Sequence, residues 1–245
     1  MSQAPPPRWL LIGNSRWHWA ERSPEGSLRG WDGAPALRGE EGRPPLAWAA
    51  VGPLPDPAWA PVDRRVSVGD VPLAGCPPWL GVDRALAGWG AWREWEEAVL
   101  VADAGTVLSL TLVTAAGRFR GGRLLAGLGL QLEAMGNRTA LLPRLQAAPH
   151  SRATPGEGGG EEERESDPAW PLATEAAMRV GVETALAGAV VAAARASDSR
   201  RLVITGGDGP LLRRRVAAPL AGLGFTVCHS PLLCLESLAR LRPGD

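Results

Sequence analysis

A strand-turn-strand segment from Val99 to Gly122 constrains the fold of this chain more than any other stretch. Val99–Val101 is a short apolar run, and a β-branched pattern resumes from Val107 to Val113 after the turn sequence Asp103-Ala104-Gly105-Thr106. Glycine lets backbone amides approach an anion, threonine adds a hydroxyl donor and aspartate can hold a cation. The hairpin therefore predicts a nucleotide phosphate site, although the same residues also fit an ordinary tight turn with a solvated aspartate.

A second glycine hairpin near the N-terminus repeats this design. Trp9–Ile12 is predicted as a strand, Gly13-Asn14-Ser15 as a turn and Arg16–Ala20 as the returning strand. Two such hairpins facing each other would clamp the phosphates of a nucleotide. His18 alternates with two tryptophans on the returning strand, and is either a ligand or an ordinary surface or packing residue.

The length and amino-acid composition of the chain exclude several classes of protein and of phosphate site. The chain has 245 residues, of which 45% are hydrophobic, so it can bury a core as one large domain or two small ones. Its 26 basic residues balance 26 acidic ones, so we expect no nucleic-acid and no membrane partner. Every basic residue is arginine, which excludes a Walker-type phosphate lysine and a Schiff-base lysine.

The cysteines and the apolar runs indicate a cytoplasmic location. Cys76, Cys228 and Cys234 are too few and too badly spaced for a disulfide framework or a zinc site. The first 15 residues have neither a basic region nor a long apolar core, and no uninterrupted apolar stretch reaches about 18 residues. We therefore expect a soluble cytoplasmic protein.

The remaining elements are predicted from apolar periodicity and from glycine and proline signals. Further strands are expected at Ala47–Val51, Arg65–Val68, Arg201–Thr205 and Phe225–Cys228. Helices are expected at Ala85–Trp95, Leu124–Met135, Thr174 to about Ala196, Pro210–Ala221 and Leu232–Leu241. Residues 21–45 are predicted as loops or short edge strands, and the glycine- and charge-rich residues 148–168 as a flexible solvated loop.

Three helix starts carry polar residues with more than one interpretation. Asp83 lies near the start of the first helix, where it is either an N-cap or a carboxylate general base. Thr174 is a natural cap for the long Ala/Val helix. The turn Gly206-Gly207-Asp208 joins a strand to a helix, an arrangement that accommodates a nucleotide base or ribose.

Taken in order, six motifs resemble the type III pantothenate kinases: GNS at 13–15, GVDR at 81–84, DAGT at 103–106, GG at 121–122, TEAAMRVG at 174–181 and TGGD at 205–208. The resemblance spans most of the chain. It implies the α/β architecture of the actin-like ATPase and sugar kinase superfamily, with two ribonuclease H-like halves whose mixed sheets are flanked by helices. The expected halves are residues 1–98 and 99–245, each with one phosphate hairpin.

The same resemblance implies an ATP-dependent phosphotransferase that phosphorylates pantothenate in the first step of coenzyme A synthesis, as a homodimer. Asp83 matches the proton acceptor, Asp103 matches the ligand of a monovalent cation, potassium or ammonium, and magnesium is expected with ATP. The implied pantothenate contacts are Gly81, Val82, Arg84 and Thr174. The implied ATP contacts are Leu11, Ile12, Gly13, Asn14, Ser15, Arg16, Trp17, His18, Thr106, Gly206 and Gly207.

This sequence departs from the family pattern in two ways, and both bear on whether the chain is an active kinase. Leu11 occupies the position where the first motif normally has an aspartate that organises metal. The chain also has no tyrosine, so a tryptophan such as Trp79 would have to fill the pantothenate pocket. One alternative is therefore a catalytically weak relative that binds ligand as an accessory or regulatory protein. A different sugar-kinase-like phosphotransferase is disfavoured by the GVDR and TEAA motifs.

Overall fold

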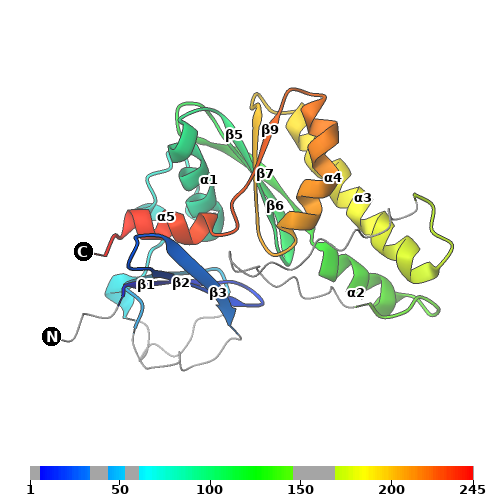
Figure 1. Cartoon of the computed structure of the whole chain (residues 1–245), viewed down its shortest axis with the longest axis horizontal. Coiled ribbons are helices and arrows are strands. Elements are labelled where there is room, and N and C mark those ends of the chain that lie inside the picture. The colour runs from blue at the N-terminus through cyan, green and yellow to red at the C-terminus, as the bar shows by residue number, and fades with distance from the viewer. Residues whose placement is uncertain (1–5, 34–43, 53–60, 146–168, 245) are drawn as a thin grey trace. The chain divides into compact units, whose positions relative to one another are not determined.

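The chain forms two compact units, described in a computed structural model over residues 6–33, 44–52, 61–145 and 169–244 (Figure 1). Unit 1 comprises Met1–Val101, Thr111–Gly121 and Leu232–Asp245, and unit 2 comprises Ala102–Leu110 and Gly122–Pro231. The two units are defined by contacts within the structure, whereas the expected halves, residues 1–98 and 99–245, were defined by the order of the motifs. These halves therefore stay a prediction. Unit 1 is discontinuous in sequence, because its last segment follows the whole of unit 2.

Unit 1 contains a four-stranded mixed sheet in the order β3-β2-β1-β4. Its strands are β1 (Arg8–Ile12), β2 (Trp17–Arg22), β3 (Leu28–Gly33) and β4 (Ala47–Ala50). β1 pairs antiparallel with β2 and parallel with β4, and β3 is the edge strand on the far side of β2. The predictions for 9–12, 16–20 and 47–51 are confirmed, and residues 21–45 supply the edge strand β3.

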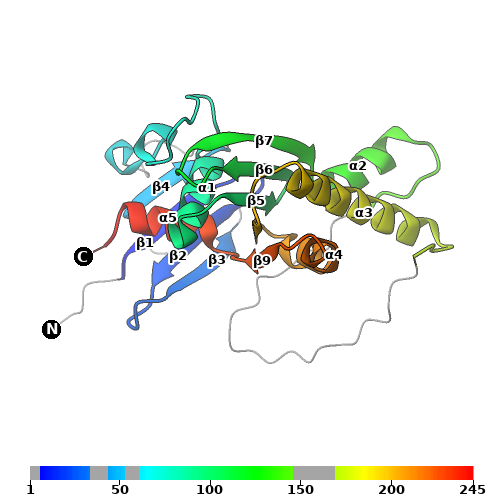
Figure 2. The ribbon, with the colours of Figure 1, turned by 90° about the horizontal axis from the view of Figure 1, so that it is seen from above.

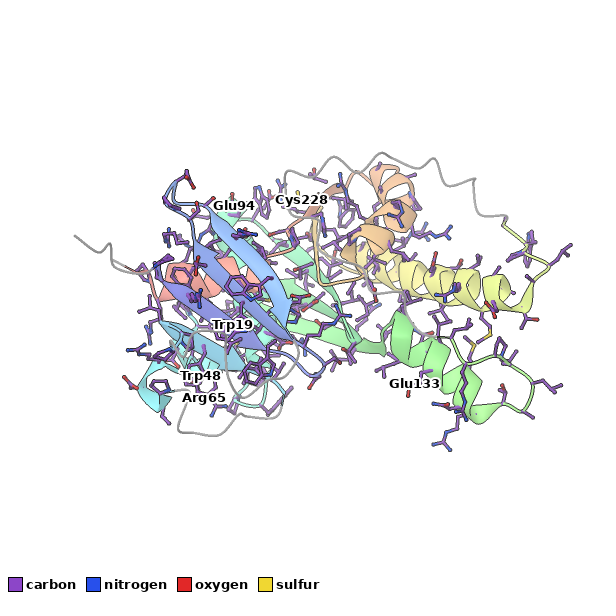
Figure 3. All side chains as sticks on the ribbon, turned by 60° about the horizontal axis from the view of Figure 1, so that its bottom comes forward. Trp19, Trp48, Arg65, Glu94, Glu133 and Cys228 are labelled. Carbon is purple, nitrogen blue, oxygen red and sulfur yellow. The ribbon has the colours of Figure 1, made fainter. Side chains whose placement is uncertain are left out.

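The two faces of this sheet bury different residues because side chains alternate along each strand. One face carries the cluster of Leu10, Ile12, Trp17, Trp19 and Trp48, which are all buried. The Arg65 guanidinium lies over the Trp48 ring at 5.4 Å from its centroid, and both residues are labelled in Figure 3. Tryptophan packing therefore supplies much of the core that positions β1 and β2.

The other face is covered by the C-terminal helix α5 (Leu233–Leu241), which packs on β1, β2 and β4. The Trp9 indole Nε1 donates a hydrogen bond to the Arg242 carbonyl at 2.9 Å. α5 also lies against α1 (Val82–Trp95), as Figure 1 shows in red and teal. A Cβ on Gly90 of α1 would overlap Ser237 Oγ, so the missing side chain allows this close approach.

A second sheet has five strands in the order β7-β6-β5-β8-β9. Its strands are β5 (Val99–Ala104), β6 (Val107–Val113), β7 (Phe119–Ala126), β8 (Arg201–Thr205) and β9 (Thr226–His229). The boundary between the units crosses β5, β6 and β7. β8 and β9 are parallel and belong to unit 2. The predicted hairpin and the predicted strands at 201–205 and 225–228 are thereby confirmed.

Unit 2 contains the helices α2 (Leu128–Arg138), α3 (Thr174–Arg195) and α4 (Gly209–Ala221). α3 packs on α2 and α4, and Figure 2 shows α3 and α4 side by side. Met178, Val182, Leu186 and Val190 repeat every fourth position and are buried. By length and apolar composition alone α3 could cross a membrane, but the core helix of a soluble protein meets the same criteria. Its Glu183 pairs with Arg215 of α4 at 2.6 Å.

Two sequence expectations are wrong in detail, and a third is not tested. Arg65 forms an isolated bridge with Trp48 and is followed by the 3-10 turn η2 (Val68–Asp70), so residues 65–68 are no strand. The same segment begins with a second 3-10 turn, η1 (Val62–Arg64). Residues 124–126 complete β7, and α2 begins only after Gly127 because tertiary pairing overrides the helical periodicity of the leucines. The expected loop at 148–168 lies outside the described residues.

Candidate functional site

The first glycine hairpin is a tight turn that rests on the segment after β4. The Gly13 amide donates to the Arg16 carbonyl at 2.9 Å and closes the turn. Gly52 packs directly on it, because a Cβ there would overlap the Gly13 carbonyl and lie 3.2 Å from the Asn14 Cα. Asn14, Ser15 and Arg16 are exposed. The turn therefore presents polar groups to solvent from a rigid base.

The strands below this turn carry the apolar residues of the expected ATP motif. Leu11, Ile12 and Trp17 are all buried, with Leu11 8% exposed. Leu11 pairs with His18 across the two antiparallel strands, so the two side chains share a face of the sheet. The position that would carry a carboxylate in the expected motif is thus a buried aliphatic side chain next to a histidine.

His18 is held by an aspartate that the sequence did not single out. His18 Nδ1 lies 2.7 Å from Asp32 Oδ1, and Arg16 Nη1 lies 3.8 Å from Asp32 Oδ2. His18 and Asp32 are register partners on β2 and β3. The other ring nitrogen, Nε2, faces Gly13, where a Cβ would lie 3.3 Å from it. Asp32 falls in a stretch rich in glycine and charge, so no periodic signal marked it.

The start of α1 is built around Asp83. Gly81 occupies the N-cap position, and a Cβ on Gly81 would overlap Asp83 Oδ1. Asp83 Oδ1 accepts a hydrogen bond from the Arg84 amide at 2.8 Å, while Cys234 Sγ of α5 contacts the Asp83 carbonyl at 3.5 Å. The interpretation of Asp83 as an N-cap is wrong, because Asp83 is the second residue of the helix and Gly81 is the cap.

Burial gives Asp83 the character of a base. Desolvation raises the pKa of the Asp83 carboxyl, and the Arg84 amide and the charge of the Arg84 guanidinium oppose that rise. A carboxylate with a raised pKa holds a proton more tightly than an exposed aspartate does. This is the property that a proton acceptor requires near neutral pH.

Arg84 is held in place by two uncharged partners. Its Nε donates to Thr111 Oγ1 at 3.1 Å, and its guanidinium lies 5.7 Å from the centroid of the Phe119 ring. Thr111 is buried on β6, and Gly88, one turn further along α1, allows the helix to approach β6 closely. Within the described residues the guanidinium forms no ion pair with a carboxylate side chain. Thr111 and Phe119 were not predicted from the sequence.

The second hairpin places its aspartate at the end of a strand. Asp103 belongs to β5, so the turn itself consists of Gly105 and Thr106. A Cβ on Gly206 would overlap Asp103 Oδ1 and the Ala104 carbonyl, and the Gly206 φ is +87°. The Asp208 amide donates to the Ala104 carbonyl at 2.9 Å. The predicted cation ligand and the predicted nucleotide turn are therefore neighbours in unit 2.

Two helices of unit 2 begin at this hairpin. The Gly127 amide, at the cap of α2, donates to the Thr106 carbonyl at 2.9 Å. α4 begins at Gly209, directly after the turn that is bonded to Ala104. Helix N-termini carry partial positive charge and free amides, so their convergence here favours an anion such as phosphate.

The donor atoms around Asp103 suit a hard cation. The carboxylate and the adjoining Ala104 carbonyl supply oxygen atoms, the ligand type that alkali and alkaline-earth cations prefer. Among the residues that the structure describes, no three His, Cys, Asp or Glu side chains come together as a metal cluster. Oxygen ligands of this kind suit a hard cation better than a transition metal.

The remaining predicted residues lie in different units. Gly81, Val82 and Arg84 belong to unit 1, whereas Thr174 is the first residue of α3 in unit 2 and is exposed. Thr174 does not cap its helix, because Ala173 takes that position. Gly207 is open, with no atom within 4 Å of a Cβ placed on it. The Trp79 side chain is 78% exposed.

Comparison with known sequences identifies relatives along most of the chain. Residues 74–196 match a family model described as type III pantothenate kinase. A type III pantothenate kinase of Synechococcus sp. (strain JA-3-3Ab) is 36% identical over 225 residues, covering 84% of this chain and 82% of that protein. One from Synechocystis sp. (strain ATCC 27184 / PCC 6803 / Kazusa) is 33% identical over 234 residues, covering 91% and 82%.

Comparison with solved structures supports the fold. A Baf family transcriptional activator from Campylobacter jejuni superposes with a TM-score of 0.58 at 17% identity, covering 96% of each chain. The activator of 2-hydroxyisocaproyl-CoA dehydratase from Clostridium difficile, with bound ADPNP, gives 0.51 at 11% identity over 96% of this chain and 93% of that one. The expected α/β architecture with mixed sheets flanked by helices is confirmed.

Proposed function

Because this chain belongs to the type III pantothenate kinase family, we propose that it transfers the γ-phosphate of ATP to pantothenate with Asp83 as the proton acceptor. The observation that carries the assignment of the base is the burial of Asp83 beside Arg84 at the start of α1. The product, 4'-phosphopantothenate, is the first intermediate of coenzyme A synthesis.

The proposed reaction begins at the primary hydroxyl of pantothenate. Asp83 accepts the hydroxyl proton as the oxygen forms a bond to the γ-phosphorus, and the bond between that phosphorus and the bridging oxygen of ADP breaks. A positioned base contributes on the order of 10²–10⁴-fold to such a step. The rest of the acceleration comes from in-line positioning and from neutralisation of phosphate charge.

Arg84 is proposed to bind the carboxylate of pantothenate. Its guanidinium is anchored by the Thr111 hydroxyl and the Phe119 ring, both uncharged, so its positive charge stays available to an anionic ligand. A guanidinium group that is already held in one orientation loses little conformational entropy when it binds a planar carboxylate. Asp83 precedes Arg84 directly, so recognition of the substrate and removal of its proton are adjacent.

Arg84→Lys is expected to raise KM for pantothenate about 10- to 100-fold and leave kcat within about threefold, because lysine cannot reproduce the bidentate fork. Steady-state kinetics with pantothenate as the varied substrate measure this. Arg93→Lys is the matched control, since Arg93 lies on the same helix and forms an exposed ion pair with Glu96. An unchanged KM in Arg84→Lys would remove Arg84 from the substrate pocket.

Nucleotide contacts are proposed separately for each unit. In unit 1 they are Gly13–Ser15 with Arg16 and His18, and in unit 2 they are Thr106, the α2 and α4 amides and the Gly206-Gly207 turn. Asp103 would hold a monovalent cation beside the phosphates. Magnesium bound with ATP would supply further neutralisation of phosphate charge.

The decisive experiment incubates purified protein with ATP, magnesium, potassium and pantothenate and detects phosphopantothenate by mass spectrometry. We expect product formation, and a fall of about tenfold or more in kcat/KM when sodium replaces potassium, because the smaller ion fits a potassium site poorly. Absence of product from the folded protein would refute the kinase assignment. Equal rates in the two salts would refute only the cation role of Asp103.

Leu11 is the observation that favours the second candidate, a catalytically weak relative that binds ligand as an accessory or regulatory protein. A buried leucine cannot organise a metal ion as the expected carboxylate would. The same assay separates the candidates, because an accessory protein would bind ATP by calorimetry without forming phosphopantothenate.

The protein is further proposed to act as a cytoplasmic homodimer. The exposed side of α3 carries small residues, Ala177, Gly181, Thr184 and Gly188, at helical spacing. Small side chains let two helices approach closely, which suits an isologous contact between identical copies. The balanced net charge gives no attraction to an anionic membrane surface.

A further inference from the structure

We propose that Asp32 is a positioning residue that orients His18 toward the phosphates of ATP at the first hairpin. The proposal rests on the proposed function, because it assigns the first hairpin to nucleotide binding. It adds a residue that lies outside the six sequence motifs and gives the His18 ring a defined orientation.

The geometry comes from three adjacent strands of one rigid sheet. Leu11, His18 and Asp32 are successive register partners on β1, β2 and β3, so their side chains form a row on one face. Asp32 Oδ1 lies 2.7 Å from His18 Nδ1, the length of a charge-assisted hydrogen bond. The imidazole is thereby fixed between a carboxylate on one side and the glycine turn on the other.

The bond to Asp32 decides what the other ring nitrogen can do. An ionised carboxylate can only accept a hydrogen bond, so Nδ1 carries the proton that it donates to Asp32, and Nε2 points away toward Gly13. In the imidazolium form Nε2–H donates to a phosphate oxygen. Asp32 also lies 3.8 Å from Arg16 Nη1, so the same carboxylate contacts both the imidazole and the arginine at the turn.

Gly13 keeps Nε2 accessible. A Cβ at this position would lie 3.3 Å from Nε2 and 3.0 Å from the Arg16 carbonyl, so any side chain would cover the nitrogen and crowd the turn. The chain has no lysine to supply a cation at the phosphates, and Leu11 supplies no carboxylate for a metal. The oriented His18 imidazole is therefore the side chain through which β2 itself would contact the nucleotide.

The kinetic test is Asp32→Asn, which keeps the shape and removes the charge. We expect kcat/KM for ATP to fall about tenfold, the effect of weakening one charge-assisted hydrogen bond, with KM for pantothenate unchanged. Glu21→Gln is the matched control, because Glu21 forms a cross-strand ion pair with Arg8 at 2.6 Å in the same sheet. A fall in Glu21→Gln equal to that in Asp32→Asn would overturn the proposal.

A double-mutant cycle shows whether Asp32 acts through His18. In a His18→Gln background, Asp32→Asn is expected to have no further effect on kcat/KM for ATP, since the group that Asp32 orients is already absent. Full additivity of the two substitutions would mean that Asp32 acts on its own and would refute the positioning role.

A spectroscopic readout separates this proposal from the kinase assignment. The chain contains three histidines, so ¹⁵N spectra of labelled protein can be assigned by substituting them in turn. We expect a protonated Nδ1 for His18 that is lost in Asp32→Asn, and a shift of Nε2 on adding ATP with magnesium. Those signals would support the proposal even if no phosphopantothenate formed. Protonation of Nδ1 unchanged in Asp32→Asn, or no response to ATP, would overturn it.

Discussion

Asp83→Asn is expected to lower kcat by about 10²–10⁴-fold while leaving the affinities for ATP and pantothenate within about threefold. Asparagine has the shape of aspartate and can still accept the Arg84 amide hydrogen bond, but it cannot take the hydroxyl proton. Calorimetric titration with each substrate, alongside steady-state rates, separates loss of chemistry from loss of binding.

The raised pKa of Asp83 adds a dependence on pH. Activity should fall as pH drops through the raised folded-state pKa, at a higher pH than an exposed aspartate would give. The contribution of Asp83 to the free energy of unfolding depends on pH in the opposite direction. The folded state binds this proton more tightly than the unfolded state, so the contribution of Asp83 to stability declines as pH rises from the ordinary aspartate pKa of 3.8 to the raised folded-state pKa.

Asp83→Asn should therefore be as stable as the wild type or more so at neutral pH, because a buried charge is removed. Asp63→Asn is the control, since Asp63 is an exposed carboxylate in the same unit. Turnover close to that of the wild type in Asp83→Asn would exclude Asp83 as the base. Destabilisation with weakened substrate binding would indicate a structural role instead.

Gly206→Ala is expected to raise KM for ATP at least tenfold and abolish the response to potassium. The Gly206 φ of +87° disfavours any side chain, and the added Cβ would overlap Asp103 Oδ1 and the Ala104 carbonyl. The backbone oxygen cannot move aside as a flexible side chain can. Strain of this kind costs about 1–3 kcal/mol, so a lower melting temperature is also expected.

Gly207→Ala provides the matched control for this prediction. The two glycines are adjacent, yet a Cβ on Gly207 meets no atom within 4 Å. Thermal unfolding of Gly207→Ala should be near that of the wild type, so the difference between the two variants measures the strain at Gly206. If Gly206→Ala keeps normal ATP kinetics and potassium response, the contact between Gly206 and Asp103 has no part in nucleotide or cation binding.

The elements that local signals specify were predicted well. Both glycine hairpins, the helix that begins near Asp83 and the strand-turn-helix around Gly206 follow from apolar runs punctuated by glycine and proline. The secondary-structure predictions were wrong at positions where tertiary contacts determine the conformation of the backbone. Leu124 reads as helical by spacing but pairs into β7, and Arg65 packs on the Trp48 ring instead of forming a strand.

Site residues outside the motifs could not be predicted for a similar reason. Asp32, Thr111 and Phe119 act through neighbours on other strands or on α1, and strand register is needed to see those pairs. The resemblance of the motifs predicted the family and assigned roles to Asp83 and Asp103. It carried no information on which residues orient His18 and Arg84.

The placement of α5 has a consequence for how the protein is made. The helix that covers β1, β2 and β4 follows all of unit 2, Ala102–Leu110 and Gly122–Pro231, in the order of synthesis. A growing chain therefore holds the first sheet with one apolar face uncovered until residues 233–241 leave the ribosome. The N-terminal sheet is synthesised early but completed late, and premature termination anywhere before α5 leaves it open to aggregation.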